Sequence, residues 1–194
     1  MRATSRSSVF IAMYAAIICV SGFISIPAGP LPLILQNAVA IAAGLVFGLP
    51  QGAAAVGMFL AVGALGLPVF SGARGGLAIM NGPTGGFLTG YFIGALVSGY
   101  IAGRPSVEER GLTKEGIMRL ARAAAAGLAF SYLIGILHFR RLTGASLPQA
   151  LALCLSPFVV PDIIKFCILI PIVARLRPMV AGFMDDDCRP PPED

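Results

Sequence analysis

Long apolar stretches, separated by short groups of glycine, proline and polar residues, make up most of the chain. No Asp, Glu, Lys, Arg or His occurs between Arg6 and Arg74. That uncharged segment is too long for a soluble fold, and its Gly and Pro residues divide it into pieces as long as a membrane-crossing helix. A transmembrane barrel would instead show short segments of alternating polarity. The pattern predicts an all-α integral membrane protein, with residues 1–194 forming a single membrane domain.

Six transmembrane spans follow from the apolar stretches, and together they predict a compact helix bundle. They cover about residues 9–26, 33–48, 52–67, 84–103, 117–138 and 147–176. The second and third spans are shorter than the roughly 20 residues that a perpendicular helix needs, so we expect them to be kinked, half-buried or packed at the rim of a cavity. The tail, residues 182–194, is polar and proline-rich and is expected to be disordered.

The distribution of lysine and arginine predicts the orientation in the membrane, because cytoplasmic loops carry an excess of these residues. With the N-terminus inside, ten of them lie on the cytoplasmic side, and three, Arg74, Arg140 and Arg141, lie on the outer side. Both termini are therefore predicted to be cytoplasmic, in a protein that crosses the cytoplasmic membrane several times. The adjacent Arg140 and Arg141 are the exception to this distribution.

Composition then excludes several classes of function. Charged residues make up 12% of the chain, whereas soluble domains have about 25%. The net charge of +5 forms no dense basic stripe with interleaved aromatics, so the expected surroundings are a lipid bilayer and not nucleic acid. The spans hold no HExxH motif, no acidic cluster and no serine with an evident histidine partner. We therefore predict no catalytic residues, no metal and no cofactor, which makes an intramembrane enzyme the least favoured class.

Asp162 and Lys165 are the most informative polar residues, because they lie within the last apolar span, residues 147–176. An ionisable group at the centre of a membrane helix costs about 2.5–3.5 kcal/mol, and such groups usually mark a functional site. Three positions apart, the two side chains share one helix face. They either form a self-satisfied ion pair that stabilises the bundle or face a cavity that binds a polar solute. Gln36 and Asn37, at the start of the second span, add two amides, and Gln36 needs a buried partner.

Glycine and alanine spacing suggests two further features. Gly82, Gly85 and Gly86, where the fourth span begins, would allow positive φ and expose backbone N–H groups to a ligand. A tight external turn is the alternative. On the first span, Ala12 and Ala16 form a small-residue face near the cytoplasmic end. Such a face either packs within the bundle or docks another membrane protein.

Four stretches carry a resemblance to a known family: Leu31-Pro32-Leu33-Ile34-Leu35-Gln36, Gly63-Ala64-Leu65-Gly66-Leu67-Pro68-Val69-Phe70, Gly82-Pro83-Thr84-Gly85-Gly86-Phe87-Leu88 and Pro161-Asp162-Ile163-Ile164-Lys165. They are similar to BioY, the biotin-binding S components of energy-coupling factor (ECF) vitamin transporters. The resemblance extends from Val9 to about Arg177. The Gly-Pro-Thr-Gly-Gly and Asp-x-x-Lys stretches are specific in combination.

The resemblance implies a compact six-helix bundle that binds biotin near the outer face, under loops, and has no catalytic residues. Two ATPases and a transmembrane T component would supply the work of transport. The spacing of Ala12 and Ala16 resembles the alanine motif by which S components dock this T component. Biotin is then the transported ligand and not a cofactor.

The implied biotin site is centred on Asp162 and Lys165. Asp162 is expected to accept hydrogen bonds from the ureido N–H groups, and Lys165 to donate either to the ureido carbonyl or to the valerate carboxylate. The other predicted site residues are Asn81, Gln36 and Asn37 as neutral hydrogen-bond partners, Arg74 for the carboxylate, Thr84 within the Gly-Pro-Thr-Gly-Gly stretch, and Phe70, Phe87 and Tyr91 against the thiophane ring and alkyl chain.

Two positions depart from the family pattern. Val160-Pro161-Asp162 stands where Pro-Gly-Asp is usual, and Pro161 is expected to be the first residue of a helix, with a break just before Asp162. Phe87 stands where tyrosine is common, which removes one hydroxyl contact. Two alternatives remain open: an S component for another small carboxylate-bearing vitamin, and a structural membrane protein without a transport role.

Overall fold

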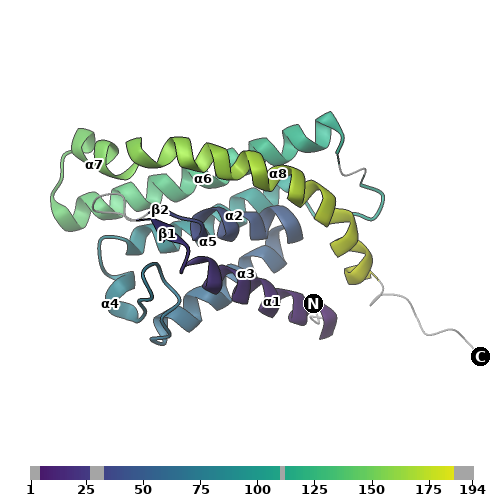
Figure 1. The fold of residues 1–194 in the computed structure, drawn as a ribbon, viewed down its shortest axis with the longest axis horizontal. Helices are drawn as coiled ribbons and strands as arrows, with labels where there is room; N and C mark the ends of the chain where they lie inside the picture. Colours follow the sequence, from purple (N-terminus) through teal and green to yellow (C-terminus); the bar gives the residue numbers. More distant parts are fainter. Residues whose placement is uncertain (1–4, 27–32, 110–111, 186–194) are drawn as a thin grey trace, which may run out of the picture.

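The computed structural model of the protein describes residues 5–26, 33–109 and 112–185, and in these the fold is helical apart from two short strands (Figure 1). The helices are α1 Ser5–Ser21, α2 Gln36–Phe47, α3 Leu49–Ala64, α4 Leu77–Met80, α5 Gly85–Ala102, α6 Lys114–Thr143, α7 Leu147–Cys154 and α8 Ser156–Asp185. The strands β1 Ser25–Ile26 and β2 Leu33–Ile34 pair antiparallel between α1 and α2. The predicted all-α class is confirmed.

Three helices in the described part of the chain, α5, α6 and α8, are long and apolar enough to cross a membrane, judged by length and composition. The apolar helices α1, α2 and α3 are shorter. With 12 residues, α2 is only about 18 Å long, less than the roughly 30 Å of a bilayer core. Every residue of α2 except Asn37 is buried. The second predicted span is therefore a short helix packed inside the bundle.

The last predicted span, residues 147–176, corresponds to two helices that meet at Leu155. Pro161 lies inside α8, so the predicted break just before Asp162 is wrong. A proline removes one backbone hydrogen bond from a helix. The helix continues through Pro161 because α8 packs against α2, α6 and α7.

The C-terminal end of α8 extends into the segment predicted to be a disordered tail. Residues 182–185 are helical, while residues 186–194 lie outside the described part. Met184 is buried, and the ring of Phe183 lies 5.9 Å from the ring of Phe10 on α1. These apolar contacts extend the helix, and they bring the start of α1 and the end of α8 to the same end of the molecule (Figure 1).

Small residues bring α5 and α6 into close contact. A β-carbon built at Gly90 would lie 2.7 Å from the Ser131 carbonyl oxygen, and one built at Gly94 would lie 2.7 Å from the Gly127 carbonyl oxygen. Neither position has room for a side chain without moving the backbone of α6. Small residues of this kind let helix backbones approach closely in a membrane protein.

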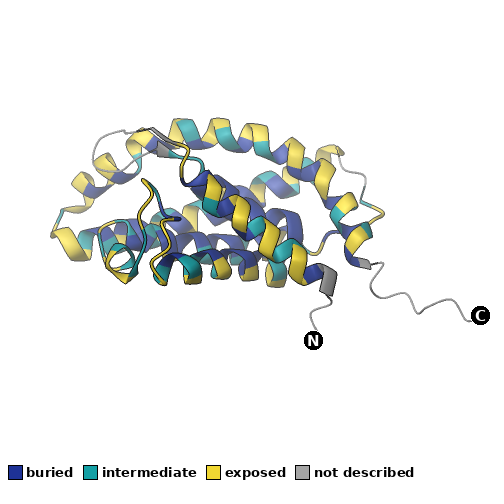
Figure 2. Ribbon diagram, turned by 60° about the horizontal axis from the view of Figure 1, so that its bottom comes forward, coloured by how far each residue is buried: buried dark blue, intermediate teal, exposed yellow. Residues whose placement is uncertain are grey.

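Burial follows the helix faces (Figure 2). Buried residues lie where helices face one another, and exposed residues lie along the outer faces, including those of α1 and α8. The exposed residues on these two helices include large apolar side chains such as Val9, Val20, Ile163 and Ile168. Apolar side chains on the outside of a helical bundle are typical of a protein surrounded by lipid.

Candidate functional site

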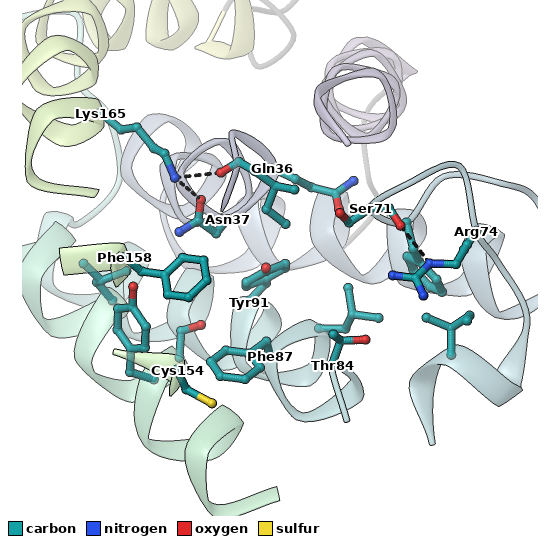
Figure 3. A pocket seen from close by; sticks show the side chains of 17 residues that line it. Gln36, Asn37, Ser71, Arg74, Thr84, Phe87, Tyr91, Cys154, Phe158 and Lys165 are labelled. Carbon is teal, nitrogen blue, oxygen red and sulfur yellow. Dashed lines mark hydrogen bonds between the residues drawn. The ribbon is translucent and has the colours of Figure 1, made fainter. Parts of the chain in front are cut away.

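A cavity of about 710 Å³, including its open part, lies between α2, α5, α6, α7 and α8 and the loop before α4 (Figure 3). Its lining consists of Ile34, Gln36, Asn37, Phe70, Ser71, Arg74, Ile79, Thr84, Phe87, Leu88, Tyr91, Leu128, Ser131, Tyr132, Cys154, Phe158 and Lys165. Figure 3 shows Lys165 and Asn37 at one side, Arg74 at the other, and the rings of Tyr91 and Phe87 between them. The cavity is thus polar at both ends and aromatic in the middle.

A hydrogen-bonded network forms the first polar end, with Asp162 at its centre. Asp162 has no exposed surface. Its carboxylate accepts hydrogen bonds from Lys165 Nζ at 2.7 Å, from Asn37 Nδ2 at 3.0 and 3.1 Å, and from the Tyr132 hydroxyl at 2.6 Å. The partners come from α8, α2 and α6, so one buried charge joins three helices. Burying a charge is tolerated when it is paired and hydrogen-bonded in this way.

Lys165 donates to three acceptors. Besides Asp162, its Nζ donates to the Ile34 carbonyl at 2.7 Å and to Asn37 Oδ1 at 3.0 Å. An ammonium group has three protons, so Lys165 is fully hydrogen-bonded in this state. A ligand acceptor at Lys165 must therefore take the place of one of these partners. The Ile34 carbonyl is the neutral backbone partner among them.

Gln36 has one buried acceptor without a hydrogen-bond partner among the described residues. Its Nε2 donates to the Ile18 carbonyl at 3.0 Å and to the Val69 carbonyl at 2.8 Å. Its Oε1 is buried and has no hydrogen-bond partner in the described structure. A buried polar atom without a partner costs about 1–3 kcal/mol. Gln36 is also one of the residues that line the cavity.

The second polar end lies at the loop before α4. Arg74 Nε donates to the Ser71 carbonyl at 3.2 Å, and Phe70 and Arg74 form an isolated antiparallel bridge. Ala73, at the tip of this turn, has a positive φ of 55°. Within the described residues, no carboxylate pairs with the Arg74 guanidinium. Its remaining N–H groups are free to bind an anion.

Most of the predicted site residues line the cavity. Those that do are Gln36, Asn37, Phe70, Arg74, Thr84, Phe87, Tyr91 and Lys165. Asp162 lies behind the lining, where it holds three of the groups that form it. Asn81 is exposed at the end of α4 and is not among the lining residues.

Tyr132, Cys154 and Phe158 line the cavity but are absent from the sequence-based prediction. Tyr132 lies in the apolar part of α6, where a tyrosine hydroxyl gives little signal. Its partner Asp162 is 30 positions away in the chain. The one signal that could have indicated Tyr132 is Asp162 itself, because a buried carboxylate needs several hydrogen-bond donors from neighbouring helices.

The glycines at the start of α5 serve close packing. Gly82, Gly85 and Gly86, which would allow positive φ, do not adopt it. Gly85 instead lies against the Met80 carbonyl, and Gly86 against the His138 side chain, where a β-carbon would clash. His138 Nε2 lies 3.1 Å from the Gly82 carbonyl oxygen. Gly85 therefore allows the start of α5 to pack closely on the end of α4, and Gly86 allows it to pack closely on α6.

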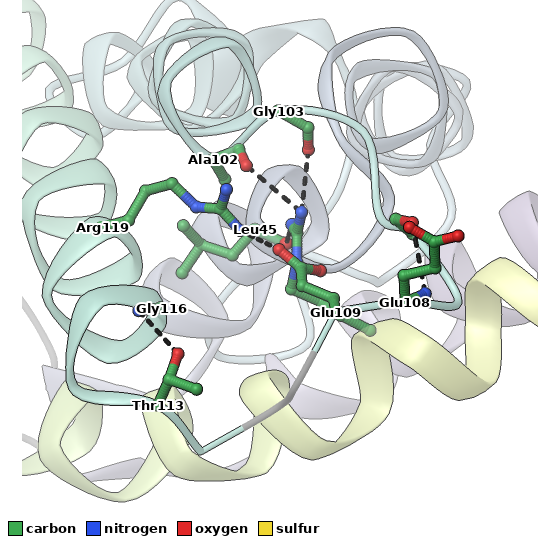
Figure 4. Close-up of polar contacts among 10 residues, drawn as sticks. Leu45, Ala102, Gly103, Glu108, Glu109, Thr113, Gly116 and Arg119 are labelled. Carbon is green, nitrogen blue, oxygen red and sulfur yellow. Dashed lines mark hydrogen bonds and ion pairs between the residues drawn. The ribbon is translucent and has the colours of Figure 1, made fainter.

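A second polar cluster lies at the other end of α8 (Figure 4). Arg177 has a side chain that is 1% exposed, and its Nε donates to Glu109 at 2.7 Å. Its other nitrogens donate to the carbonyls of Leu45, Ala102 and Gly103. These carbonyls lie at the C-terminal ends of α2 and α5, where unpaired carbonyls and the helix dipole favour a cation. Glu109 also pairs with Arg119 on α6.

Among the described residues, no helix covers the alanine face of α1. Ala12 and Ala16 are exposed, together with Val9, Met13 and Val20. The opposite face, with Ala15 and Ile18, is buried in the bundle. Packing within the chain therefore does not explain the small residues on the exposed face.

Comparison with known proteins gives consistent results. The sequence pattern of the BioY family matches residues 1–182. The biotin transporter BioY of Thermotoga maritima is 33% identical over 85% of this chain and 92% of its own length. The biotin transporter BioY of Rhizobium etli is 37% identical over 84% of this chain and 88% of its own length.

A solved structure has the same fold. The crystal structure of the S-component for biotin from an ECF-type ABC transporter matches with a TM-score of 0.78 and 30% sequence identity. The match covers 88% of this chain and 90% of that chain. Sequence and structure thus identify the same group of relatives.

Proposed function

Because this chain belongs to the BioY family, we propose that it is the substrate-binding subunit for biotin uptake. The family comprises transporter S components and not enzymes. The observation that carries the proposal is the cavity with two polar ends and an aromatic middle. Biotin has the same order of groups: a ureido ring, a thiophane ring with an alkyl chain, and a carboxylate.

The carboxylate of biotin binds at Arg74, and the ureido ring at the end formed by Asn37, Tyr132 and Lys165. Arg74 has N–H groups free for an anion, whereas the ammonium of Lys165 already has the carboxylate of Asp162 as its counter-ion. A second carboxylate at Lys165 would repel Asp162. The neutral ureido carbonyl is not repelled by Asp162 in this way. It replaces the Ile34 carbonyl as the third acceptor of Lys165.

The remaining lining residues complete the site. Tyr91, Phe87 and Phe70 pack against the thiophane ring and the alkyl chain, and the buried Gln36 Oε1 accepts an N–H group of the ligand. Thr84 adds a hydroxyl on the side of Arg74 (Figure 3). Asp162 lies behind the cavity lining, and its hydrogen bonds hold Asn37, Tyr132 and Lys165 in place. Asn81, which lies outside the cavity lining, remains a prediction as a neutral hydrogen-bond partner of biotin.

The chain lies in the cytoplasmic membrane as a six-helix bundle, with both termini inside and the cavity near the outer face. The charged loop with Arg104 and Lys114 and the Arg177 cluster then lie on the cytoplasmic side. The contact between Phe10 and Phe183 supports this arrangement, because it brings the first and last helices together at one end.

Transport depends on partner proteins, namely an ECF T component and two ATPases. The exposed face with Ala12 and Ala16 is the docking surface for the T component. The chain itself holds the vitamin, and the partners supply the energy that moves it inward.

Equilibrium binding of labelled biotin to the purified protein in detergent tests the proposal. The intact protein should bind biotin, and Lys165→Ala should weaken binding about 10- to 100-fold, the effect of losing a hydrogen bond to a charged group. Arg74→Ala should weaken binding of biotin but not of biotinamide, which lacks the carboxylate. Arg141→Ala is the matched control, since Arg141 is an exposed arginine outside the cavity lining.

Two results would refute parts of this proposal. If the intact protein binds another carboxylate-bearing vitamin and not biotin, the assigned substrate is wrong. If biotin binds the intact protein and Lys165→Ala equally well, the site is wrong.

A further inference from the structure

We infer that the Tyr132 hydroxyl oxygen accepts a hydrogen bond from a ureido N–H group of the ligand, which makes Tyr132 a specificity-determining residue. The inference rests on the proposed biotin-binding function and assigns one contact within it. Tyr132 lines the cavity, and its hydroxyl donates to Asp162 Oδ2 at 2.6 Å. It is the shortest hydrogen bond of the network around Asp162.

The direction of this hydrogen bond follows from the partners of Asp162. The carboxylate is paired with the Lys165 ammonium at 2.7 Å and also receives Asn37 Nδ2. An ionised carboxylate only accepts hydrogen bonds. The single proton of Tyr132 must therefore point at Asp162 and away from the ligand.

A phenol whose proton is committed can only accept a further hydrogen bond. The Tyr132 oxygen keeps a lone pair, and donation to a carboxylate increases its electron density, which strengthens it as an acceptor. Asp162 thus turns a group that is ordinarily both donor and acceptor into an acceptor. The chemical class that it recognises is an N–H donor, such as the two N–H groups of a cyclic urea.

The position of the Tyr132 ring is fixed as well. The ring meets Phe87 edge-on, with 6.3 Å between ring centroids and 87° between ring planes. With Phe87 on one side and Asp162 at the hydroxyl, the side chain is held at both ends. The acceptor therefore needs little rearrangement when a ligand binds, and it lies at the same polar end as Lys165, where the ureido carbonyl is placed.

A binding cycle with modified ligands and a modified protein tests the contact. Affinities are measured for biotin and for its two N-methylated forms, each with one ureido N–H replaced by N–CH₃, on the intact protein and on Tyr132→Phe. Biotin should bind Tyr132→Phe about tenfold more weakly, as expected for one hydrogen bond. One N-methylated form should bind the intact protein more weakly than biotin, and Tyr132→Phe should add little further loss for that form. Such non-additivity identifies two groups in direct contact.

Controls separate this contact from a structural effect. Tyr100→Phe removes the hydroxyl of an exposed tyrosine, 78% accessible on α5, and should bind all three ligands like the intact protein. Thermal stability of each variant in detergent shows that the fold is kept.

Three results would overturn the inference, and they can be told apart. If Tyr132→Phe weakens biotin and both N-methylated forms by the same factor, Tyr132 only positions Asp162. If both N-methylated forms bind the intact protein as tightly as biotin, no ureido N–H is recognised, whatever the behaviour of the variant. If the intact protein does not bind biotin at all, the proposed function fails and this inference fails with it.

Discussion

At the scale of single residues, the buried carboxylate of Asp162 holds three donors of the cavity wall in fixed positions. It meets Lys165, Asn37 and the Tyr132 hydroxyl, and it has no exposed surface. Removing one partner of a buried ion pair typically costs about 3–5 kcal/mol, because the other charge is left uncompensated. The surroundings of the two residues are not interchangeable. The groups around Asp162 are hydrogen-bond donors, whereas Lys165 also contacts two further acceptors.

A charge exchange tests whether this pair has more than a structural role. In Asp162→Lys with Lys165→Asp, the new lysine faces the Asn37 amide and the Tyr132 hydroxyl, and the new aspartate faces the Ile34 carbonyl. We expect this double variant to lose biotin binding in an equilibrium binding measurement. The neutral double variant Asp162→Asn with Lys165→Met should also lose binding but keep its thermal stability better, because neither charge remains buried alone. Biotin binding at the original affinity by the exchanged variant would show that the pair only stabilises the bundle.

At the scale of helices, α8 is fixed by polar clusters near both of its ends. Asp162 and Arg177 are fifteen residues apart, about 22 Å along a helix axis. Between them, Phe166, Ile170 and Val173 are buried against the bundle. One cluster serves the cavity, and the other joins α8 to the C-terminal ends of α2 and α5 and to Glu109.

Arg177→Met should destabilise the protein by about 3 kcal/mol, the low end of the range for a broken buried pair. The value is low because Glu109 keeps Arg119 as a partner. Arg175→Met is the matched control, since Arg175 is exposed two positions earlier on the same helix. Thermal unfolding in detergent should show a lower midpoint for Arg177→Met alone. Equal midpoints for the two variants would contradict the assigned role of Arg177.

The sequence predicts where most helices lie better than it predicts the boundary between α7 and α8. Apolar stretches locate α1 to α3, α5 and α6 with ends that differ by up to five residues, because a lipid-facing or buried helix needs continuous apolar residues. The predicted first and second spans also include the residues of β1 and β2. The division between α7 and α8 is not visible in the sequence, because both helices and Leu155 between them are apolar. Pro161 was expected to be the first residue of a helix, but it lies inside α8.

The cavity was predictable where its residues are unusual for a membrane helix. Lys165, Gln36 and Asn37 are polar residues in apolar spans, and each is found in the cavity wall. Tyr132 and Cys154 were not predicted, because tyrosine and cysteine are ordinary residues in such helices and only the packing brings them to the site. The placement of Asp162 behind the lining also depends on packing, which a helix-face argument alone does not provide.

At the scale of the whole molecule, the polar groups divide between two ends. The cavity with Lys165 and Arg74 lies at one end of α8, while the Arg177 cluster, the start of α1 and the end of α8 lie at the other (Figures 1 and 4). The exposed face with Ala12 and Ala16 runs along α1, away from the cavity lining. Ligand binding and partner docking are therefore expected to be separable by mutation.

Ala12→Trp and Ala16→Trp test this separation. The bulky side chain should prevent close helix approach, so capture of the T component in a co-purification experiment should fall strongly while biotin binding stays unchanged. Leu133→Trp is the matched control, because Leu133 is 54% exposed on a different helix, α6. Normal capture of the partner by both alanine variants would show that it docks elsewhere.

The orientation of biotin in the cavity tests the central claim most directly. A density map of the protein with bound biotin should show the ureido ring against Asn37, Tyr132 and Lys165, and the carboxylate at Arg74. A map with biotin in the reverse orientation, or bound outside this cavity, would contradict the account.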